Sequence, residues 1–127
     1  MMNINNQIFE LSQGFYFEAA HTLKRNYESE GSLRIHGHTY EAEVTVSGNP
    51  NLTTGMLVDL ALLRNEIESV RSLLDHQFLD EIQDLGPATL ENLATFIYSK
   101  LIIKFSNLTS VMVQRSKSGD KCVLRLK

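Results

Sequence analysis

The sequence predicts a single α+β domain, in which a four-stranded antiparallel sheet carries two helices on one face. Two segments near each end of the chain have the apolar content and period-two alternation that are typical of strands. Between these pairs, apolar residues recur every three or four positions in two further segments, which indicates amphipathic helices. The order of elements is therefore ββααββ over residues 1–127, a length that can bury its own core.

The first two strands are expected at residues 7–21 and 35–47. The earlier segment is rich in large apolar residues and contains Gly14, where a bend is expected. The polar residues 22–34 predict a long loop, a kind of segment that is often functional. In the later strand, apolar side chains occupy every second position, at Tyr40, Ala42, Val44 and Val46.

Two helices are expected to follow. Asp59 offers a side-chain oxygen to cap the first helix, whose apolar stripe comprises Leu60, Leu63, Ile67, Val70 and Leu74. Thr89 caps the second helix, which is expected to end near Phe105 and whose stripe comprises Leu90, Leu93, Ile97 and Leu101.

The closing strands are predicted at residues 110–116 and 121–126, joined by a hairpin turn at Ser118-Gly119-Asp120. A sheet of only four strands leaves two edges with unpaired backbone N–H and C=O groups. Edge-to-edge association of several copies would pair these groups, so the sequence favours an oligomer.

Composition narrows the class of function. The net charge is −3 and no basic run is present, so nucleic-acid binding is not predicted. No apolar stretch approaches the roughly 18 residues needed to span a bilayer. Residues 1–7 lack the basic and apolar regions of a signal peptide, and the one cysteine, Cys122, excludes an internal disulfide. A cytoplasmic protein without membrane or nucleic-acid partners is expected.

Three of the four histidines are candidates for a metal site. His36 and His38 are two residues apart at the start of a strand, so their side chains share one face. His21 ends the preceding strand, and pairing of the two strands would bring three imidazoles together. Three ligands with a fourth position open is the arrangement of a catalytic zinc. Spacing alone leaves the alternative open, because His-x-His pairs also occur by chance.

The fourth histidine follows an acidic residue, in Asp75-His76. A carboxylate can fix the tautomer and raise the basicity of an imidazole, which suits proton transfer. The alternative is structural, because His76 lies after the first predicted helix, where a protonated imidazole favours the C-terminal dipole and Asp75 caps the next turn.

Five motifs follow one another between residues 17 and 94: Phe17-Glu18-Ala19-Ala20-His21, His36-Gly37-His38-Thr39-Tyr40, Gly55-Met56-Leu57-Val58-Asp59-Leu60, Asp75-His76-Gln77-Phe78-Leu79 and Pro87-Ala88-Thr89-Leu90-Glu91-Asn92-Leu93-Ala94. In this order and spacing they resemble the 6-pyruvoyltetrahydropterin synthase / 6-carboxytetrahydropterin synthase family. The resemblance implies a tunnelling fold (T-fold), in which three subunits close their sheets into a twelve-stranded barrel. It also implies a homohexamer of two stacked trimers, with sites between subunits.

The resemblance further implies a chemistry. It makes His21, His36 and His38 zinc ligands and Asp75-His76 a catalytic pair that handles protons. The expected protein is a zinc-dependent lyase acting on a dihydroneopterin-type substrate. In this chemistry zinc stabilises oxyanions that develop on the substrate hydroxyls, and a proton donor near the metal drives loss of triphosphate or carbon–carbon cleavage.

One departure from the family pattern lies before the His-x-His pair. Carboxytetrahydropterin-type members have a catalytic cysteine four residues before the pair, where this chain has Ser32, a poor proton shuttle unless activated. Animal-type members have it six residues before, where this chain has Glu30, and one branch of the family uses a glutamate instead. Glu30 is therefore a candidate base and Glu28 a weaker one; alternatively, both are solvated loop charges.

A second departure lies in the third strand. The family has a glutamate there that anchors the pterin ring, and this chain has Arg115. A guanidinium has donors only, so it cannot accept from a pterin amino group and would suit an anionic or carbonyl-rich ligand. Gln114 could accept only if the strand slipped by one residue, which would turn it to the other face.

Three hypotheses remain open from the sequence. The first is a pterin-type zinc lyase that uses Asp75, His76 and Glu30 for protons. The second is a zinc-binding paralogue that acts on a different small ligand, held by Arg115. The third is a binding or structural protein without catalysis, in which zinc ties one strand to another.

Overall fold

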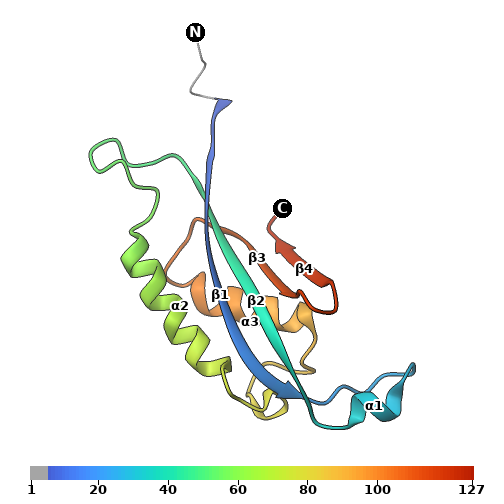
Figure 1. Ribbon diagram of the computed structural model, residues 1–127. Coiled ribbons are helices and arrows are strands. Elements are labelled where there is room, and N and C mark those ends of the chain that lie inside the picture. Colours follow the sequence, from blue (N-terminus) through green and yellow to red (C-terminus); the bar gives the residue numbers. More distant parts are fainter. Residues whose placement is uncertain (1–5) are drawn as a thin grey trace.

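The computed structural model describes residues 6–127 and places four antiparallel strands in the order β1-β2-β3-β4 (Figure 1). The predicted α+β class and the order of the main elements are confirmed, and a short helix and a 3-10 helix lie between these elements. The strands are β1 (Phe9–His21), β2 (His36–Gly48), β3 (Leu108–Arg115) and β4 (Asp120–Arg125). The helices are α1 (Ser29–Leu33), α2 (Leu60–Leu74) and α3 (Leu90–Leu101), with the 3-10 helix η2 at Leu79–Glu81.

Both long helices cover the same face of the sheet. Buried side chains alternate along the strands, so each strand turns one apolar face toward the helices. The α2 helix packs mainly on β1 and α3 packs on β3 and β4 (Figure 1). The fully buried side chains at the centre of this layer include Phe17, Tyr40, Val44, Leu63, Leu93 and Ile97.

Side-chain caps begin both long helices at the predicted residues. Asp59 accepts a hydrogen bond from the Ala61 N–H at 2.9 Å, and Thr89 accepts from the Asn92 N–H at 3.1 Å. These oxygens satisfy N–H groups that lack a partner in the first turn. The buried residues of α2 and α3 include nearly all of the two predicted stripes.

Some predicted boundaries are corrected by the structure. Residues 22–34 are not entirely a loop, because α1 forms within them at Ser29–Leu33. The α3 helix ends at Leu101 rather than near Phe105, because the residues that follow form a turn. Phe105 is nevertheless buried, which is why it continued the helical pattern of apolar residues. The β3 strand begins at Leu108, two residues earlier than predicted.

The pairing of β1 with β2 sets the position of the site. The ladder runs from Phe9 opposite Gly48 to His21 opposite His36, and it passes Gly14 without a break in register. The last residue of β1, His21, therefore lies beside the first residue of β2, His36. The predicted β3–β4 hairpin is also present, with the Gly119 N–H donating to the Arg115 carbonyl at 2.9 Å.

A segment after α2 lies along the outer edge of β1. The His76 N–H donates to the Glu18 carbonyl at 2.6 Å, and the Ala20 N–H donates to the Gln77 carbonyl at 3.0 Å. Phe78 then pairs with Ala20 in a parallel bridge. These contacts hold His76 beside the end of the strand that carries His21.

No helix within residues 6–127 has the length and apolar content needed to cross a membrane. The prediction that residues 1–7 are not a signal peptide falls mostly on residues 1–5, which lie outside the described part of the chain.

Candidate active site

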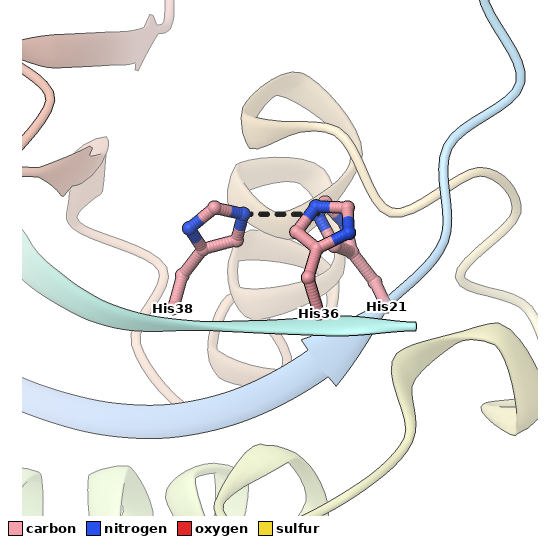
Figure 2. Close-up of side chains that lie close together, drawn as sticks. All are labelled: His21, His36 and His38. Atoms are coloured by element: carbon pink, nitrogen blue, oxygen red, sulfur yellow. Dashed lines mark hydrogen bonds between the residues drawn. The ribbon is translucent and has the colours of Figure 1, made fainter. Parts of the chain in front are cut away.

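The three histidines that were predicted to bind a metal converge at one end of the sheet. His21 lies opposite His36 in the β1–β2 ladder, and His38 lies two residues further along the same face. Figure 2 shows the three rings pointing toward one another from the strand ends. The Nε2 atoms of His21 and His36 are 3.0 Å apart, and those of His21 and His38 are 3.1 Å apart. The structure thus has the convergence that strand pairing predicts.

Backbone carbonyls determine which nitrogen of two rings faces the centre. The Nδ1 atom of His21 is 3.0 Å from the Ala88 carbonyl oxygen, and that of His36 is 2.8 Å from the Arg34 carbonyl oxygen. Because a carbonyl only accepts, each Nδ1 carries a hydrogen and donates it. In the neutral rings both Nε2 atoms then carry lone pairs. Two lone pairs facing each other at 3.0 Å repel unless a cation lies between them.

The donor set fits a zinc ion. A tetrahedral zinc with bonds of about 2.0–2.1 Å separates its ligand nitrogens by roughly 3.3 Å. The separations of 3.0 and 3.1 Å are close to that value. Imidazoles whose second nitrogen donates to a carbonyl are also the usual form of zinc-binding histidines. Three such ligands would leave a fourth coordination position open.

Burial favours the neutral form of two of these imidazoles. Desolvation lowers the pKa of His21 from 6.5, and it lowers the pKa of His38 to about 4. The positive charge of Arg115 is the second cause at His38. A metal has to displace any proton from the nitrogen that it binds, so low pKa values reduce proton competition at neutral pH.

Arg115 reaches the histidines from the end of β3. Its Nη1 donates to His38 Nε2 at 3.1 Å, and its Nη2 donates to Asp120 Oδ2 at 2.7 Å. Its Nε is buried and has no hydrogen-bond partner among the described residues. The guanidinium therefore lies between a candidate metal ligand and a carboxylate of the hairpin.

Tyr40 lies beneath the three histidines, between His38 and the hydrophobic core. Its ring centroid is 5.6 Å from that of His38 and 5.0 Å from that of Phe17, so it connects the site to the core. Burial raises the pKa of Tyr40 to about 12, against the opposing effect of the Arg115 charge. Tyr40 was not among the predicted site residues, although strand alternation places it on the face of His36 and His38.

Asp75 and His76 touch within one subunit. The Nδ1–H of His76 donates to Asp75 Oδ2 at 2.8 Å, and the Glu18 N–H donates to Asp75 Oδ1 at 2.9 Å. Arg71 Nη2 lies 3.3 Å from Asp75 Oδ2. The carboxylate is thus held from three sides, and it orients the imidazole so that His76 Nε2 is left for other partners.

The backbone at His76 adopts a conformation that is rare for a residue other than glycine. Its φ of 58° lies in the left-handed region, which a residue with a Cβ rarely occupies. Such a conformation persists only where the surroundings impose it, and it is more frequent at functional sites. The contact with β1 imposes it here, because the His76 N–H donates to the Glu18 carbonyl.

Asp75 should titrate at an unusually low pH. The Glu18 N–H is the largest cause that lowers its pKa below 3.8, and the His76 hydrogen bond is the second. Replacement of His76 by phenylalanine should therefore raise the pKa of Asp75 only part of the way back to 3.8. A carboxyl-carbon NMR titration measures this pKa. Because it is lowered by folding, Asp75 stabilises the protein above pH 3.8, and this contribution disappears as the pH falls through the folded-state value.

One cleft joins the histidine group to the Asp75–His76 pair. It has a volume of about 850 Å³, and its walls include His38 from the group, His76 from the pair, and Arg115. Lys117 and Ser118 of the β3–β4 hairpin complete one side. A small molecule in this cleft can contact both sets of residues at once.

A second cleft, of about 650 Å³, lies on the α1 side of His36. Ser32 and Glu30 both line it, and the Ser32 residue is buried while the Glu30 side chain is 89% exposed. Glu30 pairs with Arg34 at 3.3 Å. The two candidates for the missing cysteine thus lie next to a candidate metal ligand, but outside the walls of the larger cleft.

Gln114 lies apart from these residues. It donates to Glu41 Oε2 at 3.3 Å, and both line a third cleft on the open face of the sheet. The structure therefore brings Arg115 to the histidine group and turns Gln114 to the opposite face, as the alternation of a strand requires.

Comparisons with known proteins agree with this architecture. Residues 10–125 match the family described as 6-pyruvoyl tetrahydropterin synthase. A 6-carboxy-5,6,7,8-tetrahydropterin synthase of Synechocystis sp. is 36% identical over 93 residues, which cover 68% of this chain and 70% of that protein. A dihydroneopterin monophosphate aldolase of Pyrococcus furiosus is 35% identical over 85 residues, covering 67% and 68%.

A solved structure extends the likeness to the fold. The 6-pyruvoyl tetrahydropterin synthase of Caenorhabditis elegans superposes with a TM-score of 0.81 at 26% identity, over 95% of this chain and 97% of that one. The family match spans nearly the whole chain, from the second residue of β1 to the last residue of β4. This chain is therefore a member of the 6-pyruvoyl tetrahydropterin synthase family.

Proposed function

We propose that this protein is a zinc-dependent lyase that acts on a dihydroneopterin-type substrate. One observation carries the proposal: His38 of the histidine group and His76 of the acid–base pair line the same cleft. The names of the relatives support the substrate class, since they include a carboxytetrahydropterin synthase and a dihydroneopterin monophosphate aldolase.

The metal would be held by the Nε2 atoms of His21, His36 and His38. Zinc held there would supply Lewis acidity, which favours negative charge on a nearby substrate oxygen. The chain contributes the geometry, because the carbonyls of Ala88 and Arg34 keep two rings in the tautomer that presents Nε2.

Proton transfer falls to His76. Its Nδ1–H is held by Asp75, so Nε2 is the atom that takes or returns a proton of the substrate. The negative carboxylate stabilises the imidazolium that forms when Nε2 is protonated. The side chain of His76 is 76% exposed, so a substrate in the cleft can reach it.

A second proton-handling group is proposed on the α1 side. Glu30 is the candidate base, since a carboxylate accepts protons more readily than the hydroxyl of Ser32. Both line the cleft beside His36. Glu30→Gln should therefore lower turnover, whereas Ser32→Ala should have the smaller effect.

The proposal is tested by product identification. Zinc-loaded protein is incubated separately with dihydroneopterin triphosphate, dihydroneopterin monophosphate and dihydroneopterin, and the products are identified by mass spectrometry. A pyruvoyl, carboxy or hydroxymethyl pterin establishes the lyase, and its identity reveals the branch of the family. No turnover and no binding of any of the three would overturn the proposed substrate class.

The proposed assembly is a homo-oligomer, a trimer or a hexamer. The sheet has β1 and β4 at its edges, so pairing of β4 with β1 of another copy would close it. The segment at Gln77 and Phe78 covers only the end of the β1 edge. Native mass spectrometry distinguishes the trimer and the hexamer from a monomer.

The second candidate function is a family paralogue that uses a different, anionic ligand. The observation that favours it is Arg115, which lines the cleft where the family resemblance places a glutamate. Arg115→Glu is expected to improve pterin binding, because a carboxylate can accept hydrogen bonds from the pterin ring. Isothermal titration with a dihydropterin measures the change. Unchanged pterin affinity would remove this interpretation of the Arg115 position.

A further inference from the structure

Arg115 and a metal ion need the same lone pair. In the neutral ring His38 has one nitrogen that accepts, and Arg115 Nη1 lies 3.1 Å from Nε2, the atom that faces the other two histidines. A metal bound to that nitrogen leaves nothing for the guanidinium to bind. The two cations therefore exclude each other at His38. The family resemblance assigns no such role to this position, where it implies a pterin-binding glutamate.

We propose that Arg115 is a built-in competitor for zinc, which occupies the third ligand of the site until the metal displaces it. This inference rests on the zinc site proposed above. Arg115 acts through His38, so it is a positioning residue, and its effect is on the affinity for the metal. The site then has two states, one with Arg115 on His38 and one with zinc on all three imidazoles.

The contacts of the guanidinium indicate that Arg115 can leave His38 and stay bound to Asp120. Nη2 is anchored to Asp120 Oδ2 at 2.7 Å, and the Asp120 side chain is 46% exposed on the hairpin. Only Nη1 touches His38, so the side chain can release the imidazole and keep its carboxylate partner. The pose on His38 also leaves Nε buried without a hydrogen-bond partner among the described residues, which makes release less costly.

Electrostatic repulsion adds to the competition between Arg115 and zinc for the lone pair of His38. A zinc ion at the three Nε2 atoms would lie a few ångströms from the guanidinium, where two positive charges repel strongly in a partly buried site. Asp120 offsets part of this repulsion, because its carboxylate neutralises the guanidinium and draws it toward the hairpin. Loss of Asp120 should strengthen the competition, and loss of Arg115 should end it.

The test is the zinc affinity of four purified proteins, measured by competition with a chromophoric chelator: wild type, Arg115→Met, Asp120→Asn and the double variant. Arg115→Met is expected to bind zinc at least about tenfold more tightly, because zinc no longer has to break a hydrogen bond to a charged group. Asp120→Asn is expected to bind zinc at least about threefold more weakly. In the double variant the Asp120 effect should largely vanish, since the guanidinium through which it acts is gone.

Controls separate this inference from a general effect of charge. Lys117→Met removes a cation from the same cleft and should change zinc affinity less than threefold. An equal or weaker affinity in Arg115→Met would overturn the inference, as would an Asp120 effect of the same size with and without Arg115. If Arg115→Met does not fold, an unchanged or increased affinity in Asp120→Asn would overturn it. Absence of zinc binding in both wild type and Arg115→Met would instead overturn the zinc site itself.

Discussion

Replacement of His36 by alanine is expected to reduce bound zinc from about one ion per chain to almost none. The variant leaves two ligands, His21 and His38, and affinity should fall by more than the 10–100-fold that is typical when an outer partner of a ligand is lost. Elemental analysis of the purified protein measures the stoichiometry. Lyase activity should be lost with the metal, and so should the rise in Tm that added zinc causes in the wild type.

His36 is a better choice than His21 for this experiment. His21 is 2% exposed, so its removal would leave a cavity and destabilise the protein for a second reason. His76→Gly is the matched control, because that histidine is not part of the converging group and should leave the zinc content unchanged. Full zinc occupancy in His36→Ala would show that the ligand assignment is wrong.

Replacement of His76 by glycine is expected to lower kcat by about 10²–10⁴-fold, the usual contribution of a general acid–base group. The free energy of unfolding should change by no more than about 1 kcal/mol. Glycine relieves the strain of the left-handed backbone at φ 58°, and this gain offsets the extra entropy of a glycine in the unfolded chain. Steady-state kinetics and urea unfolding measure the two quantities on the same protein preparation.

Asp75→Asn tests the same pair from its other side. The amide keeps the shape of the side chain but removes the negative charge that stabilises the His76 imidazolium, so kcat should fall while zinc content stays constant. A kcat within threefold of wild type in both variants would mean that the pair only ends α2 and attaches the next segment to β1.

The convergence of the three histidines could be predicted from the sequence because it depends on local periodicity. His36 and His38 are two residues apart on a strand, and His21 ends the strand that pairs with it. Once an antiparallel ladder is assumed, the three side chains must lie on one face. The caps at Asp59 and Thr89 are local in the same sense, because each reaches only two or three residues ahead.

Other parts of the site depend on contacts between residues that are far apart in the chain. The Ala88 carbonyl that holds His21 comes from the segment before α3, 67 residues away, and the contact of Arg115 with His38 spans 77 residues. The Asp75–His76 pair reaches the cleft because its segment forms hydrogen bonds with the edge of β1. No periodic pattern in the sequence predicts these contacts between distant segments.

By itself, the sequence determined the α+β class, the faces of the strands and the three converging imidazoles, because each follows from the period of a strand or a helix. Only the tertiary structure decided which further groups share a cleft with them: His76 and Arg115 beside His38, and Ser32 and Glu30 beside His36. The physical reason is that helix packing and strand register bring distant segments together. The orientation of each side chain then decides which charged groups and lone pairs come into contact, as with Arg115 and His38.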